Sequence, residues 1–64
     1  MIKDNLRKAR EAKGITQEEL ERLSGISQSM ISSLETGRIP NPTIATVRSL
    51  SSALGIAFEE LVKE

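Results

Sequence analysis

Glycines at positions 14, 25, 37 and 55 divide this chain of 64 residues into short segments, and this division constrains the fold more than any other feature. Between the glycines, apolar residues recur every three or four positions, which is the spacing of one face of an α-helix. Glycine readily takes the left-handed backbone conformation that ends a helix. No segment alternates apolar and polar residues, so no strand is expected. The sequence therefore predicts an all-α fold of short helices, in one domain over residues 1–64.

Capping residues indicate where the helices begin. Thr16 and Glu19 have the spacing of a capping box, which predicts a second helix over about residues 17–24. Ser27 is the candidate cap of a third helix over about 28–36. The prolines of RIPNPT forbid a continuing helix, so a fourth begins after Thr43 and ends at Gly55. A first helix up to Lys13 and a short fifth helix complete the chain.

The apolar stripes of these helices predict the core. The residues expected to face it are Ile2, Leu6, Ala9, Leu20, Ile31, Leu34, Ile44, Val47, Leu50 and Leu54. A fifth helix covering the end of the bundle is expected to contain Ile56, Phe58, Leu61 and Val62.

Histidine and cysteine are absent from the sequence, which removes the usual general bases, thiol nucleophiles and zinc ligands. We therefore expect no enzyme, no metal site and no cofactor, and no small-molecule substrate is evident. The N-terminal stretch MIKDNLRKAR is too charged for the apolar core of a signal peptide, and no apolar run approaches membrane-spanning length. We expect a cytoplasmic protein without membrane contact.

The formal net charge is zero, but the charges are unevenly distributed along the chain. Residues 1–13 carry an excess of three positive charges, residues 16–35 are acidic, and residues 38–57 hold two arginines and no acidic residue. Such segregation allows a basic face on a neutral molecule. Ordinary solvated helix surfaces explain the charges equally well.

Two short helices joined by a tight turn at Gly25 form a helix-turn-helix, whose second helix can lie in the major groove of DNA. The spacing alone is a weak signal, because any small helical bundle needs such hairpins. In their order, however, ITQEEL, SGIS, MISSLETGR, NPTIATV and SALGI resemble the phage-repressor family of Cro and lambda repressor, over about residues 6–62. The resemblance implies a five-helix, lambda repressor-like DNA-binding domain of a transcriptional regulator, typically a homodimer on a near-palindromic operator.

The resemblance also implies which residues meet DNA. Base reading falls to the third-helix face opposite Ile31 and Leu34, which carries Gln28, Ser29, Ser32 and Ser33. Gln28 can pair with the N6 and N7 edge of adenine, whereas serine hydroxyls both donate and accept and so discriminate weakly. The residues expected to contact phosphates are Gln17, Ser27, Thr36, Arg38 and Asn41. Without the resemblance, the serines would suit an ordinary soluble surface.

Two further expectations rest on the same resemblance. Arg10 and Glu35 match an ion pair that joins the first and third helices and orients them. A weak homodimer is expected to form through an apolar patch near the prolines, made of Ile39, Ile44, Phe58 and Val62.

The chain departs from the family pattern at three positions. Glu21 stands where an alanine usually packs against the third helix, so it must be desolvated, push the helices apart, or turn outward to pair with Arg22 or Arg48. Ala57 replaces a hydroxyl cap of the fifth helix, which weakens that helix by about 1 kcal/mol. Ser51 replaces an alanine that faces the core.

The leading hypothesis is a sequence-specific regulator of double-stranded DNA, acting as a repressor through the third helix. The neutral charge and the lack of Lys and Arg in that helix leave alternatives open. One is a protein-interaction module of antitoxin or antirepressor type on the same scaffold. Another is a designed or reconstructed domain with weak DNA binding.

Overall fold

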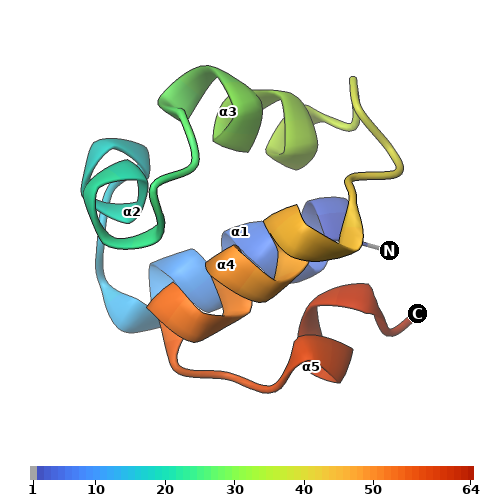
Figure 1. The fold of residues 1–64 in the computed structure, drawn as a ribbon. Coiled ribbons are helices and arrows are strands. Elements are labelled where there is room, and N and C mark those ends of the chain that lie inside the picture. Colours follow the sequence, from blue (N-terminus) through green and yellow to red (C-terminus); the bar gives the residue numbers. More distant parts are fainter. Residues whose placement is uncertain (1) are drawn as a thin grey trace.

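The computed structural model describes residues 2–64, which form α-helices and no strands (Figure 1). The helices are α1 (Ile2–Lys13), α2 (Gln17–Ser24), α3 (Gln28–Thr36), α4 (Ile44–Leu54) and α5 (Phe58–Val62). The all-α architecture with five helices in this range is confirmed.

Side-chain caps begin the second, third and fourth helices, as their sequences predict. The hydroxyl of Thr16 accepts from the amide of Glu19 at 3.1 Å, and the Glu19 carboxylate accepts from the Thr16 amide at 2.8 Å. At the starts of α3 and α4, the hydroxyls of Ser27 and Thr43 likewise accept from the amides of Met30 and Thr46, without a returning carboxylate. Gly25, with φ of 78°, ends α2 in the left-handed conformation. These local signals confine the turn between α2 and α3 to residues 25–27.

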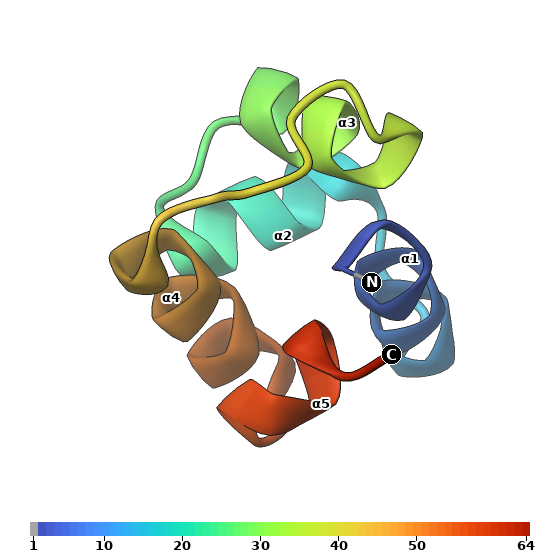
Figure 2. The ribbon, with the colours of Figure 1, turned by 90° about the vertical axis from the view of Figure 1, so that its right-hand side faces the viewer.

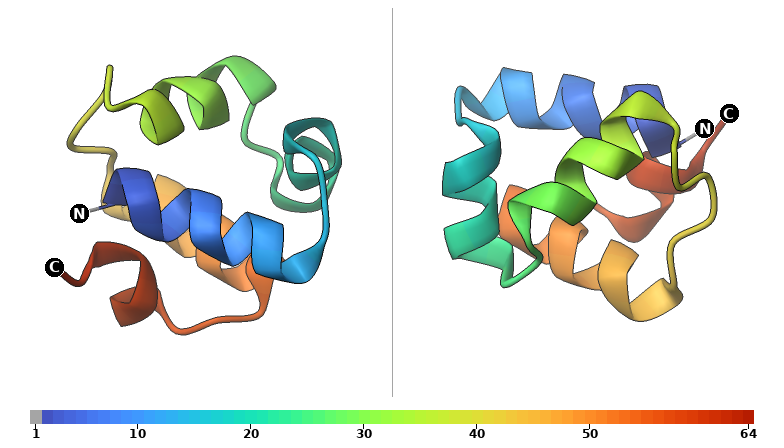
Figure 3. Two further views of the ribbon diagram at one scale, coloured as in Figure 1. Left: turned by 180° about the vertical axis from the view of Figure 1, so that it is seen from behind. Right: turned by 90° about the horizontal axis from the view of Figure 1, so that it is seen from above.

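The helices surround one apolar core to which each of them contributes. Its buried members are Ile2, Leu6, Leu20, Ile31, Leu34, Val47, Leu50, Leu54 and Leu61. Helices α3 and α5 lie on opposite sides of α1 and α4 (Figures 1 and 2). Seen from above, α3 crosses over the bundle and is not covered by another helix (Figure 3). The fold therefore leaves the outer face of α3 open to solvent.

Besides the shared apolar core, one polar side chain of α1 holds the end of α5. The side-chain amide of Asn5 donates from Nδ2 to the backbone carbonyls of Leu61 at 3.0 Å and Lys63 at 2.6 Å. These carbonyls lie at the end of α5, where no further turn satisfies them. Leu61 is fully buried beneath this contact.

The predictions for Ile44 and Ile56 are wrong in detail. Ile44 is 63 % exposed because it is the first residue of α4, where the chain arrives from the proline loop. Val62, which lines the same groove as Ile44, is 42 % exposed, in keeping with the apolar patch expected there. Ile56 lies in the loop before α5 rather than within it, although it packs against the core. Ser51 is buried as expected, and its hydroxyl donates to the carbonyl of Arg48 at 3.0 Å.

Candidate nucleic-acid interface

The outer face of α3 is built from small polar side chains. Gln28 and Ser29 in its first turn are exposed, and Ser32 and Ser33 one turn later are half-buried. Ile31 and Leu34 anchor the opposite face and are fully buried. Because side chains four positions apart on a helix lie above one another, the four polar residues form one continuous strip. This strip is low in relief, so another surface can approach the α3 backbone closely.

The first turn of α3 is held by two side chains from outside the helix. The Ser27 hydroxyl accepts from the amide of Met30 at 3.1 Å. Glu21, in α2, accepts from the amide of Gln28 at 3.2 Å. These amides belong to the donors that no helical carbonyl reaches, and a negative charge is favourable beside them.

The position of Glu21 corrects an expectation. Its side chain is exposed, so the alternatives of a desolvated or helix-separating carboxylate are wrong. Its carboxylate turns outward, as the third alternative required, but meets the start of α3 instead of Arg22 or Arg48. Alanine could not make this contact.

Exposed polar and basic residues continue beyond the end of α3. Thr36 is exposed and donates to the carbonyl of Ser33 at 3.2 Å, and Arg38 and Asn41 are exposed in the following loop. Together with Ser27, these side chains flank the α3 strip at both ends. The structure thus brings the expected phosphate-contacting residues of this region to the borders of the expected base-reading face.

Lys3 joins this border, which no motif in the sequence indicated. A Cβ atom added at Gly37 would lie 3.1 Å from Lys3 Cδ, so the lysine side chain runs against the end of α3. The cationic excess of residues 1–13 was the available signal, but it did not indicate which basic residue lies against the exposed end of α3.

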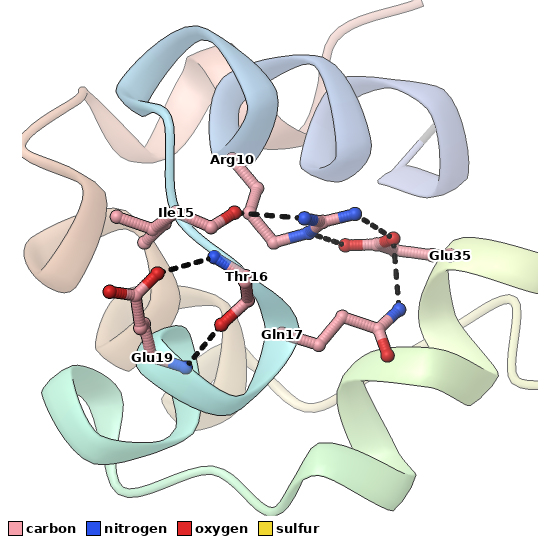
Figure 4. A network of polar contacts seen from close by, with 6 residues as sticks. All are labelled: Arg10, Ile15, Thr16, Gln17, Glu19 and Glu35. Carbon is pink, nitrogen blue, oxygen red and sulfur yellow. Dashed lines mark hydrogen bonds and ion pairs between the residues drawn. The ribbon is translucent and has the colours of Figure 1, made fainter.

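A polar network joins α1, α2 and α3 beneath the strip (Figure 4). Arg10 donates from Nε to Glu35 Oε2 at 2.7 Å and from Nη2 to Oε1 at 3.0 Å. Its Nη1 donates to the carbonyl of Ile15 at 2.9 Å. The ion pair expected from the resemblance therefore forms, with the two side chains 15 % and 4 % exposed.

The electrostatics of this pair favour both charged forms. Burial alone would raise the pKa of Glu35, but hydrogen bonds from Arg10 and Gln17 outweigh it and hold that pKa below its usual value. The hydrogen bond to Glu35 likewise raises the pKa of Arg10, against the opposing effect of burial. Arg10 and Glu35 are therefore both charged near neutral pH.

Gln17 belongs to this network, which its sequence position did not indicate. Its Nε2 donates to Glu35 Oε1 at 3.1 Å, and its side chain is half-buried (Figure 4). An amide nitrogen carries two hydrogens, so one remains for another acceptor. Glu35 thus fixes the orientation of the residue that the sequence assigns to a phosphate.

An apolar groove lies where the proline loop and the start of α4 meet α5. Its lining includes Pro40, Pro42, Ile44, Phe58 and Val62. Three of the four residues of the expected dimer patch therefore come together. Ile39 does not line the groove, because it packs against the core and its amide donates to the carbonyl of Ser33 at 3.2 Å.

Within residues 2–64, no group of three or more acidic side chains is arranged to hold a metal ion. No helix in the same range is long and apolar enough to cross a membrane.

Comparison with known proteins gives one family match. A helix-turn-helix family model matches residues 6–61. The chain is 48 % identical over 62 residues to an uncharacterized HTH-type transcriptional regulator of Sinorhizobium fredii, covering 97 % of this chain and 79 % of that protein. It is 37 % identical over 57 residues to a second such regulator, of Bacillus subtilis, covering 89 % and 41 %.

An enzyme is also among the relatives. The chain is 36 % identical over 61 residues to a glutamine–fructose-6-phosphate aminotransferase of Methanocaldococcus jannaschii, covering 95 % of this chain but 6 % of that protein. Because the match covers so small a share of that enzyme, it does not indicate the enzyme's activity for this chain. No solved structure gives a significant match.

Proposed function

Because this chain belongs to the helix-turn-helix family, we propose that it binds double-stranded DNA as a transcriptional regulator and reads the major groove with α3. The names of the relatives in Sinorhizobium fredii and Bacillus subtilis support a role in regulation. The aminotransferase match supports no enzymatic role, since it spans so little of that protein.

The observation that carries the proposal is the uncovered strip of Gln28, Ser29, Ser32 and Ser33 on α3. A recognition helix contacts base edges mainly with its N-terminal residues, and here those residues are Gln28 and Ser29, both exposed. Gln28 can form a bidentate pair with adenine. The serines allow close approach and add contacts of low selectivity.

Phosphate contacts would hold α3 in register in the groove. The exposed residues that flank the strip are suited to this role: Lys3, Ser27, Thr36, Arg38 and Asn41. Gln17 would contribute the second hydrogen of its amide, while Glu35 holds the first. By occupying an operator in this way, the protein would act as a repressor.

A single recognition helix contacts few bases, so useful specificity requires two copies on one duplex. We assign pairing to the apolar groove, where Ile44 and Val62 expose apolar surface beside Phe58. The patch is small, which supports weak self-association in free solution and cooperative pairing on DNA. Half-sites should then lie about 34 Å apart. Sedimentation of the protein with a palindromic duplex tests this, and a one-to-one complex at saturation would contradict it.

The same groove supports a second candidate function, the binding of a different protein. An NMR titration separates the two functions. Addition of duplex DNA should shift the amide signals of Gln17 and of residues 28–33 if α3 reads DNA. Shifts confined to α5 and residues 40–44 on addition of a partner protein, with no response to DNA, would favour the interaction module instead.

A further inference from the structure

Glu21 places a negative charge at the start of the proposed reading helix. Its Oε1 accepts from the amide of Gln28 across the turn, and the side chain is exposed to solvent. Within residues 2–64, its other oxygen has no hydrogen-bond partner. The carboxylate is therefore both anchored and available.

No charge of α3 itself offsets this carboxylate. Residues 28–36 contain one ionisable side chain, Glu35, which is buried in its pair with Arg10. The exposed part of the strip consists of an amide and hydroxyls, which both donate and accept hydrogen bonds. The Glu21 carboxylate beside the strip can only accept hydrogen bonds. It can therefore reject base edges that present only acceptors, which the amide and hydroxyls of the strip would tolerate.

On the basis of the proposed function, we propose that Glu21 is a specificity-determining residue for DNA. The Glu21 oxygen that accepts from the Gln28 amide fixes the first turn of α3. It thereby also fixes how the Gln28 side chain approaches its base pair. The second oxygen of Glu21 accepts from the exocyclic amine of cytosine or adenine in the neighbouring base pair. Guanine and thymine present only acceptors, O6 and N7 or O4, at the corresponding edge, and the carboxylate repels them.

The same charge acts on the backbone of the DNA. Phosphates favour helix N-termini, but the start of α3 is already occupied by a carboxylate. The amide of Gln28 is therefore not available to a phosphate, which leaves the first turn to the bases, while the proposed phosphate contact of Ser27 uses its side-chain hydroxyl.

Three variants separate these effects. Glu21→Gln keeps an acceptor for the Gln28 amide but adds a donor in place of the charge. Glu21→Ala removes both the anchor and the charge. Glu18→Gln is the matched control, because Glu18 is an exposed residue of the same helix and the substitution changes the net charge equally.

The test begins with a random-sequence duplex library from which the wild-type protein selects a binding site. Dissociation constants are then measured for every single base-pair change in the selected duplex. Glu21→Gln should reduce discrimination at one base pair by about fivefold or more, while Glu18→Gln leaves the profile unchanged. Glu21→Ala should in addition weaken discrimination at the base pair read by Gln28.

A second readout uses the free protein. Hydrogen exchange of the Gln28 amide should be faster in Glu21→Ala than in the wild type, and close to wild type in Glu21→Gln. If the wild type selects a duplex but Glu21→Gln and Glu18→Gln give the same profile, the inference is overturned alone. If the wild type enriches no sequence, the proposed function fails and this inference fails with it.

Discussion

Arg10 and Glu35, 25 positions apart in the sequence, form a two-pronged ion pair between α1 and α3, with contacts of 2.7 and 3.0 Å. The same carboxylate accepts from Gln17 of α2 at 3.1 Å. The buried Glu35 of α3 thus links both helices of the helix-turn-helix, α2 and α3, to α1.

Arg10→Ala should lower the free energy of unfolding by about 3 kcal/mol, because it leaves the Glu35 charge buried without its partner. A loss of this size approaches the whole stability of a domain this small. Urea denaturation followed by circular dichroism measures it. The matched control is Glu60→Gln in the exposed pair with Lys63, which should cost under about 1 kcal/mol. Equal effects of the two substitutions would mean that the Arg10 pair adds nothing through its burial.

Stability should decline as the pH falls below 4.5, the ordinary pKa of a glutamate. The folded-state pKa of Glu35 is lowered, so its contribution is complete above that pH and is lost as the pH falls through the folded value. Glu19, whose pKa is lowered by the hydrogen bond from the Thr16 backbone, acts in the same direction. Thermal unfolding between pH 3 and 7, about the range in which carboxyl groups titrate, tests this. Glu35→Gln should flatten the profile, and an unaltered profile would assign the pH dependence to other carboxylates.

Ala57→Ser should stabilise the protein by about 1 kcal/mol. Ala57 precedes α5 and makes no side-chain cap, while Glu60 stands three positions later, where a capping box needs an acid. The matched control is Ala45→Ser in the first turn of α4, an exposed position where serine gains no cap. A rise in melting temperature for the control alone would show that capping does not limit α5.

Gln28→Ala should relax the preference for one base pair, at a cost of about 1–3 kcal/mol on the preferred duplex. Gln17→Ala should instead weaken all duplexes alike, since a phosphate contact carries no sequence information. Binding to the preferred duplex and to its single-base variants distinguishes the two. Uniform, equal losses for both substitutions would remove Gln28 from the reading role.

The affinity for DNA should depend weakly on salt. Each neutralised phosphate contributes about 0.9 to the log–log slope, and α3 contains no Lys or Arg. Arg38→Gln should reduce the slope by about 1. Lys63→Gln should leave it unchanged, because the Lys63 ammonium pairs with Glu60 of α5 and is assigned no phosphate contact. A wild-type slope of magnitude near 10 would contradict this small set of phosphate contacts.

The helices and most of the core follow from the sequence because they depend on neighbouring residues. Thr16, Ser27 and Thr43 cap helices with partners three positions away, so spacing alone identifies them. The apolar stripes likewise place Leu20, Ile31 and other residues in the core without knowledge of the neighbouring helix. The Arg10–Glu35 pair, in contrast, was expected only through resemblance to a family.

Tertiary structure decided which polar groups meet across helices. Gln17 reaches Glu35, and Glu21 reaches the amide of Gln28, because of the angle at which α2 and α3 cross. That angle results from the packing of several side chains at once and leaves no periodic trace in the sequence. Ile44 matches the apolar stripe of α4 yet remains exposed, because periodicity defines the face of a helix but not how far its neighbours extend along it.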